Sequence, residues 1–244
     1  MIISINELTK IYGNGESQVN AVNNISTSFQ AGEFCAIIGA SGSGKTTLLH
    51  MLGGLDAPTS GSVKYDDIDI YNLSDRKQAE LRRKKCGFVF QFFNLIPELT
   101  AEENILLPIL LDNGKIDRPY IGELVKLLGI TERLSHYPSQ MSGGQQQRTA
   151  IARAMANNPE IIFCDEPTGN LDEKSGENVI RMLIDVQRKF GKTVIIVTHD
   201  NNIAKRADRV IRVADGKIVE DRSFDNKQEY DTPPTIKATT AEPV

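Results

Sequence analysis

Hydrophobic and polar residues change their spacing along the chain, and each change predicts a different kind of element. Near the N-terminus, apolar and polar positions alternate in IISINEL and ISTSF, and residues 34–38 form a short apolar run. Alternation with a period of two is typical of half-buried strands. The pattern becomes helical after Gly44 and ends at Gly53-Gly54, where glycine commonly terminates a helix. Residues 1–54 therefore predict a β-rich start followed by one helix.

From residue 142 onward, helical and apolar segments alternate regularly. We expect helices over about 142–156, 173–189 and 201–207, strands over 161–164 and 193–197, and a final pair of strands, 210–213 and 217–219, around Asp215-Gly216. This alternation is typical of a parallel sheet covered by helices. The sequence therefore predicts an α/β body.

Residues 92–140 carry only helical signals. Thr100 and Glu103 form a capping box ahead of ENILLPILL, and an amphipathic segment follows at residues 121–128. We expect a helical lobe, about residues 92–140, inserted into a domain that covers residues 1–222. Residues 223–244 are rich in Thr, Pro and charge and have little to bury, which predicts a disordered tail.

The composition excludes several classes of protein. Hydrophobic residues make up 40% and charged residues 25%, which is ordinary for a globular protein and unlike a collagen, a coiled-coil rod or a disordered chain. Lys and Arg number 28 against 32 Asp and Glu, a formal charge of −4. Because there is no basic excess to hold a phosphate backbone, we do not expect nucleic acid as a partner.

No apolar segment has the length of a membrane span. The longest nearly continuous stretch, residues 105–111, is interrupted by Pro108 and is far shorter than the roughly 20 residues that cross a bilayer. The first residues have neither a basic start nor a long apolar stretch, so we do not expect a signal peptide. Cys35, Cys86 and Cys164 lack C-x-x-C spacing, which favours reduced thiols in the cytosol.

The strongest local signal is the segment GASGSGKTT, which matches G-x-x-x-x-G-K-[ST] between an expected strand and an expected helix. In such a loop the backbone N–H groups bind phosphates, Lys45 reaches the β- and γ-phosphates, and the Thr46 hydroxyl binds Mg²⁺. The sequence therefore predicts a polyphosphate site. Its candidate binding residues are Gly39, Ser41, Gly42, Ser43, Gly44, Lys45, Thr46 and Thr47.

Three further expected strands end in polar side chains. Asp165 and Glu166 follow IIFC, His199 follows VIIVT, and Gln91 follows GFVF. Each could be an ordinary strand-end residue, but the carboxyl ends of parallel strands face one crevice. Adjacent residues of a strand point to opposite sides, so we assign Asp165 to the Mg²⁺ shell and Glu166 to the attacking water. We expect His199 to reach the γ-phosphate or that water.

A second glycine-rich helix start lies at MSGGQQQR. Ser142 and Gln145 form a capping box, so the segment could simply be a well-capped helix. However, Gly143 and Gly144 each cost up to about 1 kcal/mol relative to alanine in a helix, which capping alone does not explain. Bare N–H groups and a hydroxyl at a helix N-terminus favour an anion. The chain therefore carries two predicted phosphate-binding helix starts.

Taken together, GASGSGKTT, MSGGQQQR, IIFCDEPTGNLD and VTHD resemble the ATPase subunit of an ABC transporter. The resemblance covers residues 1 to about 222. It implies a P-loop NTPase fold, with a RecA-like parallel sheet, an N-terminal antiparallel β subdomain and the inserted helical lobe. It also implies ATP and Mg²⁺ as ligands, and hydrolysis of ATP to ADP and phosphate.

The resemblance implies roles for single residues. They are Tyr12 as the aromatic that stacks on adenine, Gln91 as the Q-loop glutamine that also reaches Mg²⁺, Ser142, Gly143, Gly144 and Gln145 as the signature, Asp165 as the Walker B acid, Glu166 as the catalytic base, Asp172 as the D-loop acid, and His199 as the switch histidine. Met141 stands where leucine is usual. Two subunits of this family pair head to tail, so Ser142 and Gly144 would serve the nucleotide of the partner.

The segments GGLDAPTSG, FVFQFFNLIPELTAEEN and RADRVIRVADGKIVED resemble the branch that serves macrolide-export, lipoprotein-releasing and antimicrobial-peptide-resistance permeases. The resemblance implies a separate membrane permease, a homodimer of ATPase subunits, and a position at the cytoplasmic face of the membrane. We expect permease contacts near Phe92, Phe93, Leu95 and Ile96, although these residues could equally form the core of the lobe.

Two other functions fit parts of the sequence. A P-loop phosphotransferase would leave MSGGQ unexplained and has no evident acceptor pocket. A soluble ABC ATPase could act as a switch on ribosomes, DNA or cell-wall regulation. Its relatives usually carry two cassettes or long inserted coils, whereas these 244 residues hold one cassette. The transported compound is not encoded in this chain, because specificity would lie in the permease.

Overall fold

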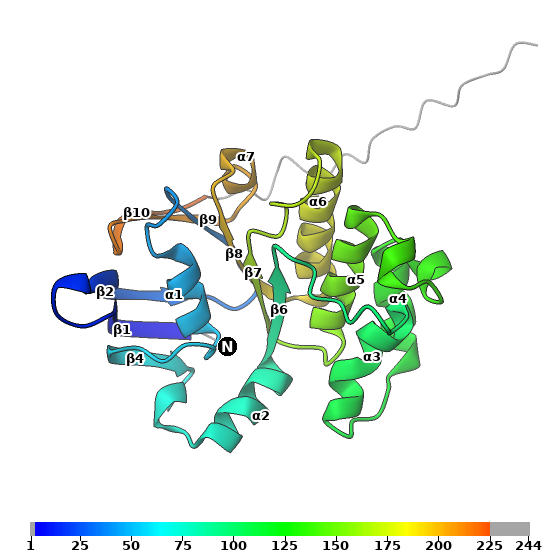
Figure 1. The fold of residues 1–244 in the computed structure, drawn as a ribbon, viewed down its shortest axis with the longest axis horizontal. Helices are drawn as coiled ribbons and strands as arrows, with labels where there is room; N and C mark the ends of the chain where they lie inside the picture. The colour runs from blue at the N-terminus through cyan, green and yellow to red at the C-terminus, as the bar shows by residue number, and fades with distance from the viewer. Residues whose placement is uncertain (1–2, 225–244) are drawn as a thin grey trace, which may run out of the picture.

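The structure is a computed structural model that describes residues 3–224, and these residues form two sheets and their helices (Figure 1). The tail expected at residues 223–244 lies outside the described residues, apart from Ser223, which ends the last strand, and Phe224. The strands are β1 (Ile3–Tyr12), β2 (Val19–Phe29), β3 (Phe34–Ile38), β4 (Ser60–Tyr65), β5 (Ile68–Asp69), β6 (Cys86–Phe90), β7 (Ile161–Asp165), β8 (Thr193–Thr198), β9 (Arg209–Ala214) and β10 (Lys217–Ser223). The α-helices are α1 (Lys45–Leu52), α2 (Asp75–Lys85), α3 (Ala101–Leu111), α4 (Arg118–Leu127), α5 (Gly143–Met155), α6 (Glu173–Phe190) and α7 (Asn201–Ala204).

The N-terminal strands form an antiparallel sheet of four, in the order β2-β1-β4-β5. β1 pairs with β2 on one side and with β4 on the other. Ile3, Ile5 and Leu8 of β1 are buried, because alternating apolar residues place one face of the sheet in the core. The predicted antiparallel β subdomain is confirmed.

The larger sheet has the order β10-β9-β3-β8-β7-β6, in which β10 alone runs antiparallel to its neighbour. Its register aligns the strand ends: Ile38 pairs with Thr198, and Asp165 pairs with Val197 on one side and Phe90 on the other. The carboxyl ends of β3, β6, β7 and β8 therefore meet at one edge, as the apolar runs predicted.

Two hydrophobic cores cover the two faces of this sheet. In β8, Val194 and Ile196 pack toward α5, α6 and the lobe, whereas Ile195 and Val197 pack toward α1 and the antiparallel sheet. Figure 1 shows α5 and α6 on the opposite side of the sheet from α1. Both faces are buried, which explains why β3, β7 and β8 are continuously apolar rather than alternating.

Residues 92–140 contain α3 and α4, and α3 packs on α5. The capping box predicted at Thr100 and Glu103 is present in both directions, side chain to backbone and back. The prediction of a helix over 201–207 is wrong about where the helix ends. α7 ends at Ala204, and the N–H groups of Arg206 and Ala207 bond three residues back, as in a turn.

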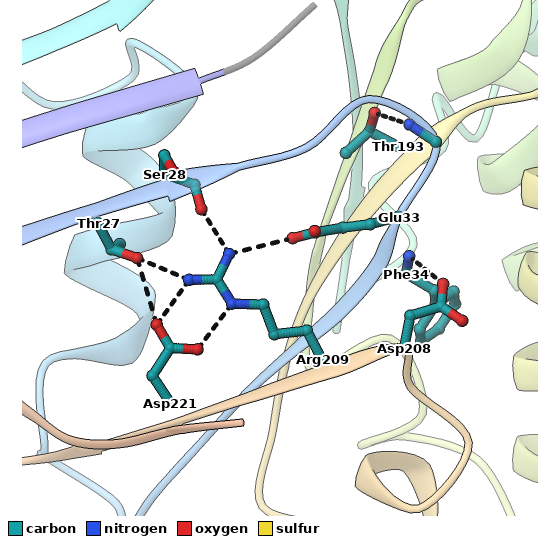
Figure 2. Close-up of polar contacts among 9 residues, drawn as sticks. Thr27, Ser28, Glu33, Phe34, Thr193, Asp208, Arg209 and Asp221 are labelled. Carbon is teal, nitrogen blue, oxygen red and sulfur yellow. Dashed lines mark hydrogen bonds and ion pairs between the residues drawn. The ribbon is translucent and has the colours of Figure 1, made fainter. Parts of the chain in front are cut away.

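A buried arginine ties the last two strands to the N-terminal sheet (Figure 2). The guanidinium of Arg209 in β9 binds both oxygens of Asp221 in β10, at 2.7 and 2.6 Å. The same group donates to Thr27 Oγ1 at 2.8 Å and to the Ser28 carbonyl of β2, and it lies 3.5 Å from Glu33 Oε1. Its side chain is only 13% exposed, so this network joins the two sheets in a largely desolvated setting.

All three cysteines are free and buried. Burial is the main reason that the pKa of the Cys86 thiol rises to about 11, and it also raises the pKa of Cys35 and Cys164. The thiols therefore remain protonated and behave as small apolar side chains.

Candidate nucleotide-binding site

The loop between β3 and α1 uses backbone conformations that glycine adopts most easily. Gly42 and Gly44 have φ of 77° and 100°, and a Cβ on Gly44 would lie 1.9 Å from the carbonyl oxygen of Ala21. A Cβ on Gly39 would lie 2.2 Å from the carbonyl oxygen of Val213. The loop therefore turns tightly into α1, whose first N–H groups have no partners within the helix and favour an anion.

Lys45 lies over this loop. Its side chain is 6% exposed, and its Nζ donates to the carbonyl oxygen of Ala40 at 2.7 Å. A buried ammonium group held against the loop is positioned for the outer phosphates of a nucleotide.

Thr46 and Asp165 are in direct contact across the site. Thr46 Oγ1 donates to Asp165 Oδ1 at 2.8 Å, and His50, one turn further along α1, places Nε2 3.6 Å from Asp165 Oδ2. A hydroxyl and a carboxylate are the hard oxygen donors that Mg²⁺ prefers, usually with phosphates and waters completing its shell. The donor set therefore fits Mg²⁺. No group of three His, Cys, Asp or Glu side chains suited to a metal occurs among the described residues, and Mg²⁺ at a nucleotide does not need one.

Glu166 does not continue the strand, which corrects the geometric argument made from sequence. β7 ends at Asp165, and Glu166 has φ of 46°, the left-handed region that is costly for a non-glycine residue, about 1–3 kcal/mol. Its N–H donates to the Val197 carbonyl at 3.0 Å, which anchors this turn on β8. Asp165 and Glu166 therefore diverge because the backbone turns between them, and not because of strand alternation.

His199 lies against Glu166. Its Nδ1 is 3.0 Å from Glu166 Oε2, and the exposed fractions of the two side chains are 73% and 19%. The imidazole therefore lies on the solvent side of the more buried carboxylate.

Gln91 leaves β6 and is held against the segment that follows Glu166. Its Nε2 lies 3.4 Å from Asn170 Oδ1, and Asn170 Nδ2 donates to the Gln91 carbonyl at 3.0 Å. A Cβ on Gly169 would lie 2.8 Å from Gln91 Nε2, so a larger residue at 169 would displace the Gln91 side chain from this position.

These side chains surround one cleft of about 670 Å³, a size typical of small-ligand sites. Its lining residues are Ser41, Gly42, Gly44, Lys45, Thr46, Thr47, Gln91, Glu166, Gly169 and His199. The loop and three strand ends therefore meet at the same cavity. Gly39 and Ser43 belong to the loop but do not line the cavity, and a Cβ on Gly39 would lie 2.8 Å from Ser43 Oγ. Asp165 contacts the cavity wall through Thr46.

Tyr12 lies beside the loop and is held by a charged pair. Its hydroxyl donates to Asp56 Oδ2, and its side chain interacts with Thr47 at the end of the loop. Lys10 donates to Asp56 Oδ1 at 2.6 Å and lies 4.9 Å from the centroid of the Tyr12 ring. Partial burial and the Asp56 carboxylate raise the pKa of the Tyr12 phenol, so it remains a donor. The ring is 42% exposed.

The signature residues lie outside this cleft, at the N-terminus of α5. The capping box is present: Ser142 Oγ accepts from the Gln145 N–H at 3.3 Å, and Gln145 Oε1 accepts from the Ser142 N–H at 3.0 Å. Among the described residues, a Cβ on Gly144 would meet only the Ser175 side chain, at an ordinary 3.5 Å. A Cβ on Gly143 would lie 3.3 Å from Leu171. Packing within the chain therefore does not require a glycine at 144.

Asp172 caps α6, since its carboxylate accepts from the Ser175 N–H at 3.0 Å. The hydrogen bonds from Ser175 hold the pKa of Asp172 below its usual value. Asp172 does not line the loop cleft. It borders a neighbouring hollow of about 750 Å³ that His199 also lines. The histidine therefore lies between the cleft and this second hollow.

The four apolar residues beyond Gln91 divide into two pairs. Phe92 and Ile96 are 68% and 37% exposed, whereas Phe93 and Leu95 are half-buried. A Cβ on Gly143 would approach the Phe93 ring to 3.5 Å, so this ring packs under the start of α5. Of these four residues, Phe92 and Ile96 offer the larger exposed surface to a partner.

Several residues at the site were not predicted from the sequence. His50 is four positions after Thr46, a helical spacing that places both on one face. Asn170 follows Glu166 closely in TGN, a turn-type segment. Asp56 and Gln147 carried no local signal, because their partners are distant in sequence.

The loop, the cleft and the strand-end carboxylates define a P-loop nucleotide-binding protein. A family model described as ABC transporter matches residues 22–169. The lipoprotein-releasing system ATP-binding protein LolD of Geobacter metallireducens is 44% identical, over 90% of this chain and 99% of that protein. The uncharacterized ABC transporter ATP-binding protein MJ1508 of Methanocaldococcus jannaschii is 48% identical, over 90% and 98%. The macrolide export ATP-binding/permease protein MacB of Syntrophobacter fumaroxidans is 45% identical, but the match spans only 31% of that longer protein.

Solved structures agree with these relatives. The dimeric post-hydrolysis structure of the ATP-binding cassette MJ0796 of Methanocaldococcus jannaschii, bound to ADP and Pi, is similar with a TM-score of 0.82 and 43% identity, covering 91% of this chain and 98% of that one. The chain belongs to the ABC transporter family and is one of its ATP-binding proteins, an ABC ATPase close to the MacB, LolD and MJ0796 branch. No helix within residues 3–224 is long and apolar enough to span a membrane.

Proposed function

We propose that this chain is the ATP-hydrolysing subunit of a transporter that expels a drug, an antimicrobial peptide or a lipoprotein. Its residues 1–222 form the ATPase domain, with the lobe at about 92–140. One observation carries the proposal: the Glu166–His199 pair lines the P-loop cleft, whereas the second anion-type helix start at Ser142 lies outside it. The cleft has the chemistry for hydrolysis, and the separate helix start is available to another copy.

In the proposed reaction, the N-terminus of α1 and Lys45 bind the β- and γ-phosphates. Glu166 orients the attacking water and accepts its proton. His199 contacts Glu166 at 3.0 Å and holds the carboxylate in place. The Tyr12 ring stacks on adenine, supported by its position beside Thr47 and its partial exposure.

Thr46, Asp165 and Gln91 are the residues that would hold Mg²⁺. When bound, Mg²⁺ would supply charge neutralisation at the β- and γ-phosphate oxygens. The contact of 2.8 Å between Thr46 and Asp165 supports this assignment, because it brings the two oxygen donors together.

The partner copy is proposed to complete the site. Two chains pair head to tail, so that Ser142 to Gln145 of one chain bind the γ-phosphate held by the other, while Asp172 lies at the junction. The exposed Ser142 at the N-terminus of α5 supports this arrangement, and so does the finding that packing within the described residues does not require a glycine at position 144. The related cassette MJ0796 is dimeric.

A separate integral-membrane permease is the proposed second partner, which would hold the chain at the cytoplasmic face of the membrane. The related MacB is a macrolide export protein and the related LolD belongs to a lipoprotein-releasing system, which supports an exporter or extractor. The exposed side chains of Phe92, directly after Gln91, and of Ile96, five positions after it, offer the contact surface.

Two variants test the proposal. Glu166→Gln is expected to bind ATP, lose turnover and shift to a dimer when ATP is added, measured by phosphate release and light scattering. Lys45→Ala is expected to lose nucleotide affinity, measured by equilibrium binding. Parental turnover in Glu166→Gln would remove the base assignment, and unchanged affinity in Lys45→Ala would remove the P-loop assignment.

A further inference from the structure

One buried side chain outside the cleft holds the backbone beside both Gln91 and Glu166. Gln147 lies on α5 and is 0% exposed. Its amide nitrogen donates to the carbonyl oxygen of Phe90 at 3.2 Å and to that of Pro167 at 2.7 Å. Phe90 directly precedes Gln91, and Pro167 directly follows Glu166. A single amide group therefore links the ends of β6 and β7.

The orientation of this amide is determined by its partners. Both are carbonyl oxygens, so the NH₂ group must face them, and both of its hydrogens are used. The Oε1 atom of Gln147 is buried with no hydrogen-bond partner among the described residues. A buried unpaired acceptor is unfavourable, and an apolar side chain would avoid it. The two hydrogen bonds from the amide nitrogen to the strand ends compensate for the unpaired Oε1 atom.

Glu166 needs such support because its backbone is in an unfavourable conformation. A non-glycine residue with φ of 46° persists only when its surroundings hold it. The Glu166 N–H is held by the Val197 carbonyl, and its own carbonyl accepts from the Gly169 N–H, both at 3.0 Å. Gln147 holds the next carbonyl along the chain. Movement of Gln147 would therefore alter the direction of the Glu166 side chain.

The same helix also holds the segment that follows Gln91. Arg153 of α5 donates to the carbonyl oxygens of Phe93 at 3.0 Å and Asn94 at 2.5 Å. Gln147 and Arg153 therefore bind the two ends of residues 90–94, and both side chains belong to the helix that begins after Ser142.

We propose that Gln147 is a positioning residue for ATP hydrolysis, which keeps Gln91 and Glu166 aligned with each other and with the signature helix. The inference rests on the proposed function, since it assumes that Glu166 serves the attacking water. The two hydrogen-bond acceptors of Gln147, the carbonyl oxygens of Phe90 and Pro167, belong to residues that do not line the cleft, so Gln147 acts through the backbone of these residues and not on nucleotide directly.

Gln147→Met tests this role, because methionine has similar length and no donor. We expect kcat to fall by about 10- to 100-fold, as for a small misplacement of catalytic groups, while KM for ATP changes by less than about twofold. Without nucleotide, amide hydrogen exchange at residues 90–94 and 166–169 should become faster. If Gln147→Met does not fold, Gln147→Asn keeps the amide but is one methylene too short, and the same kinetic result is expected.

Gln187→Met is the matched control. Gln187 of α6 also donates from a partly buried amide to a backbone carbonyl, that of Gly32, at 2.6 Å, but far from the cleft. It should lose thermal stability with kcat unchanged. A Gln147 variant that loses no more kcat than this control, or that changes KM alone, overturns the inference. Glu166→Gln is measured in parallel: if it retains turnover, the proposed function fails, whereas an inactive Glu166→Gln beside a normal Gln147→Met refutes only the inference.

Discussion

His199 Nδ1 lies 3.0 Å from Oε2 of Glu166 and 3.1 Å from Oε1. The two residues are 33 positions apart in the chain, and they meet because β7 and β8 end at the same edge of the sheet. The imidazole is largely exposed and the carboxylate largely buried, so the histidine is the outer member of the pair. A neutral imidazole that donates from Nδ1 would hold the carboxylate without removing its capacity to accept a proton.

His199→Ala should therefore lower kcat by about tenfold or more, because the carboxylate loses the group that orients it. His199→Gln should retain more activity, since its amide can still donate to Glu166. Steady-state phosphate release at saturating ATP measures both. Equal activity in His199→Ala and the parent would contradict a role for this contact in turnover.

The contact between Thr46 and Asp165 predicts a defect in Mg²⁺ dependence. Thr46→Val keeps the shape of the side chain and removes the hydroxyl that donates to Asp165 at 2.8 Å. We expect the Mg²⁺ concentration for half-maximal ATP binding to rise by about tenfold, the loss of one good oxygen ligand. Nucleotide binding is measured over a range of Mg²⁺ concentrations and again in EDTA. The comparison separates a defect in Mg²⁺ binding from a direct defect in nucleotide binding. Thr46→Ser should behave as the parent, and an equal defect in EDTA would argue against a metal role.

Complementation between two inactive variants tests the composite site. Ser142→Phe should abolish turnover by blocking the exposed start of α5, and Lys45→Ala should abolish it at the P-loop. In an equimolar mixture, mixed dimers contain one intact site, made of the P-loop of the first variant and the signature of the second. Turnover should therefore reappear on mixing. A mixture that remains inactive, or a Ser142→Phe protein with full activity alone, would count against head-to-tail pairing.

Asp56 should contribute to binding of the adenine base of the nucleotide and not to binding of its phosphates. Its carboxylate accepts from Tyr12 and Lys10. Burial alone would raise its pKa, but these two hydrogen bonds outweigh burial and lower the pKa, so the acceptor stays ionised above pH 3.8. Asp56→Ala should weaken ATP binding by about tenfold, the loss of a charge-assisted hydrogen bond. Tripolyphosphate affinity should not change.

A double variant provides the control for Asp56. If Asp56 acts through the Tyr12 ring, Asp56→Ala should cause no further loss of ATP affinity when Tyr12→Ala is already present. Additive losses would show that Asp56 acts independently of the ring.

The Arg209 network should contribute mainly to stability. Arg209→Met leaves the Glu33 and Asp221 carboxylates without their guanidinium, and we expect the free energy of unfolding to fall by on the order of 3 kcal/mol. Arg212→Met, in the same strand, removes an exposed pair with Glu220 at 3.2 Å and should cost less than about 1 kcal/mol. Urea denaturation compares the two. If both variants lost the same free energy of unfolding, burial of the Arg209 network would make no contribution to stability.

The decrease in the free energy of unfolding that Arg209→Met causes should become smaller as the pH falls. Burial is the main cause that raises the pKa of Glu33, while Arg209 lowers it, so without Arg209 the carboxyl should bind a proton at a still higher pH. Between 4.5 and that raised pKa the folded state binds more protons than the unfolded state, and stability increases toward acid. Denaturation of both proteins at neutral pH and near pH 5 measures this change. A constant difference would contradict the role of Glu33.

Much of the fold could be predicted from local patterns. The apolar runs of β3, β7 and β8 and the capping boxes at Thr100 and Ser142 depend on neighbours within a few residues. Such signals survive without tertiary information. The P-loop signal was equally local, since its glycines, Lys45 and Thr46 all lie within residues 39–46. The end of α7 was mispredicted because four residues of helix carry too weak a pattern to distinguish them from a turn.

The sequence by itself determined which groups are available for phosphate chemistry, because backbone conformation at glycines and the order of strand and following loop are properties of short segments. Only the tertiary structure decided which of these groups meet. It brought His199 to Glu166 and Thr46 to Asp165, left Ser142 outside that cleft, and attached Asp56 to Tyr12 and Gln147 to two strand ends. The physical reason is that a hydrogen bond between distant residues depends on the packing of whole elements, which no short segment of the chain records.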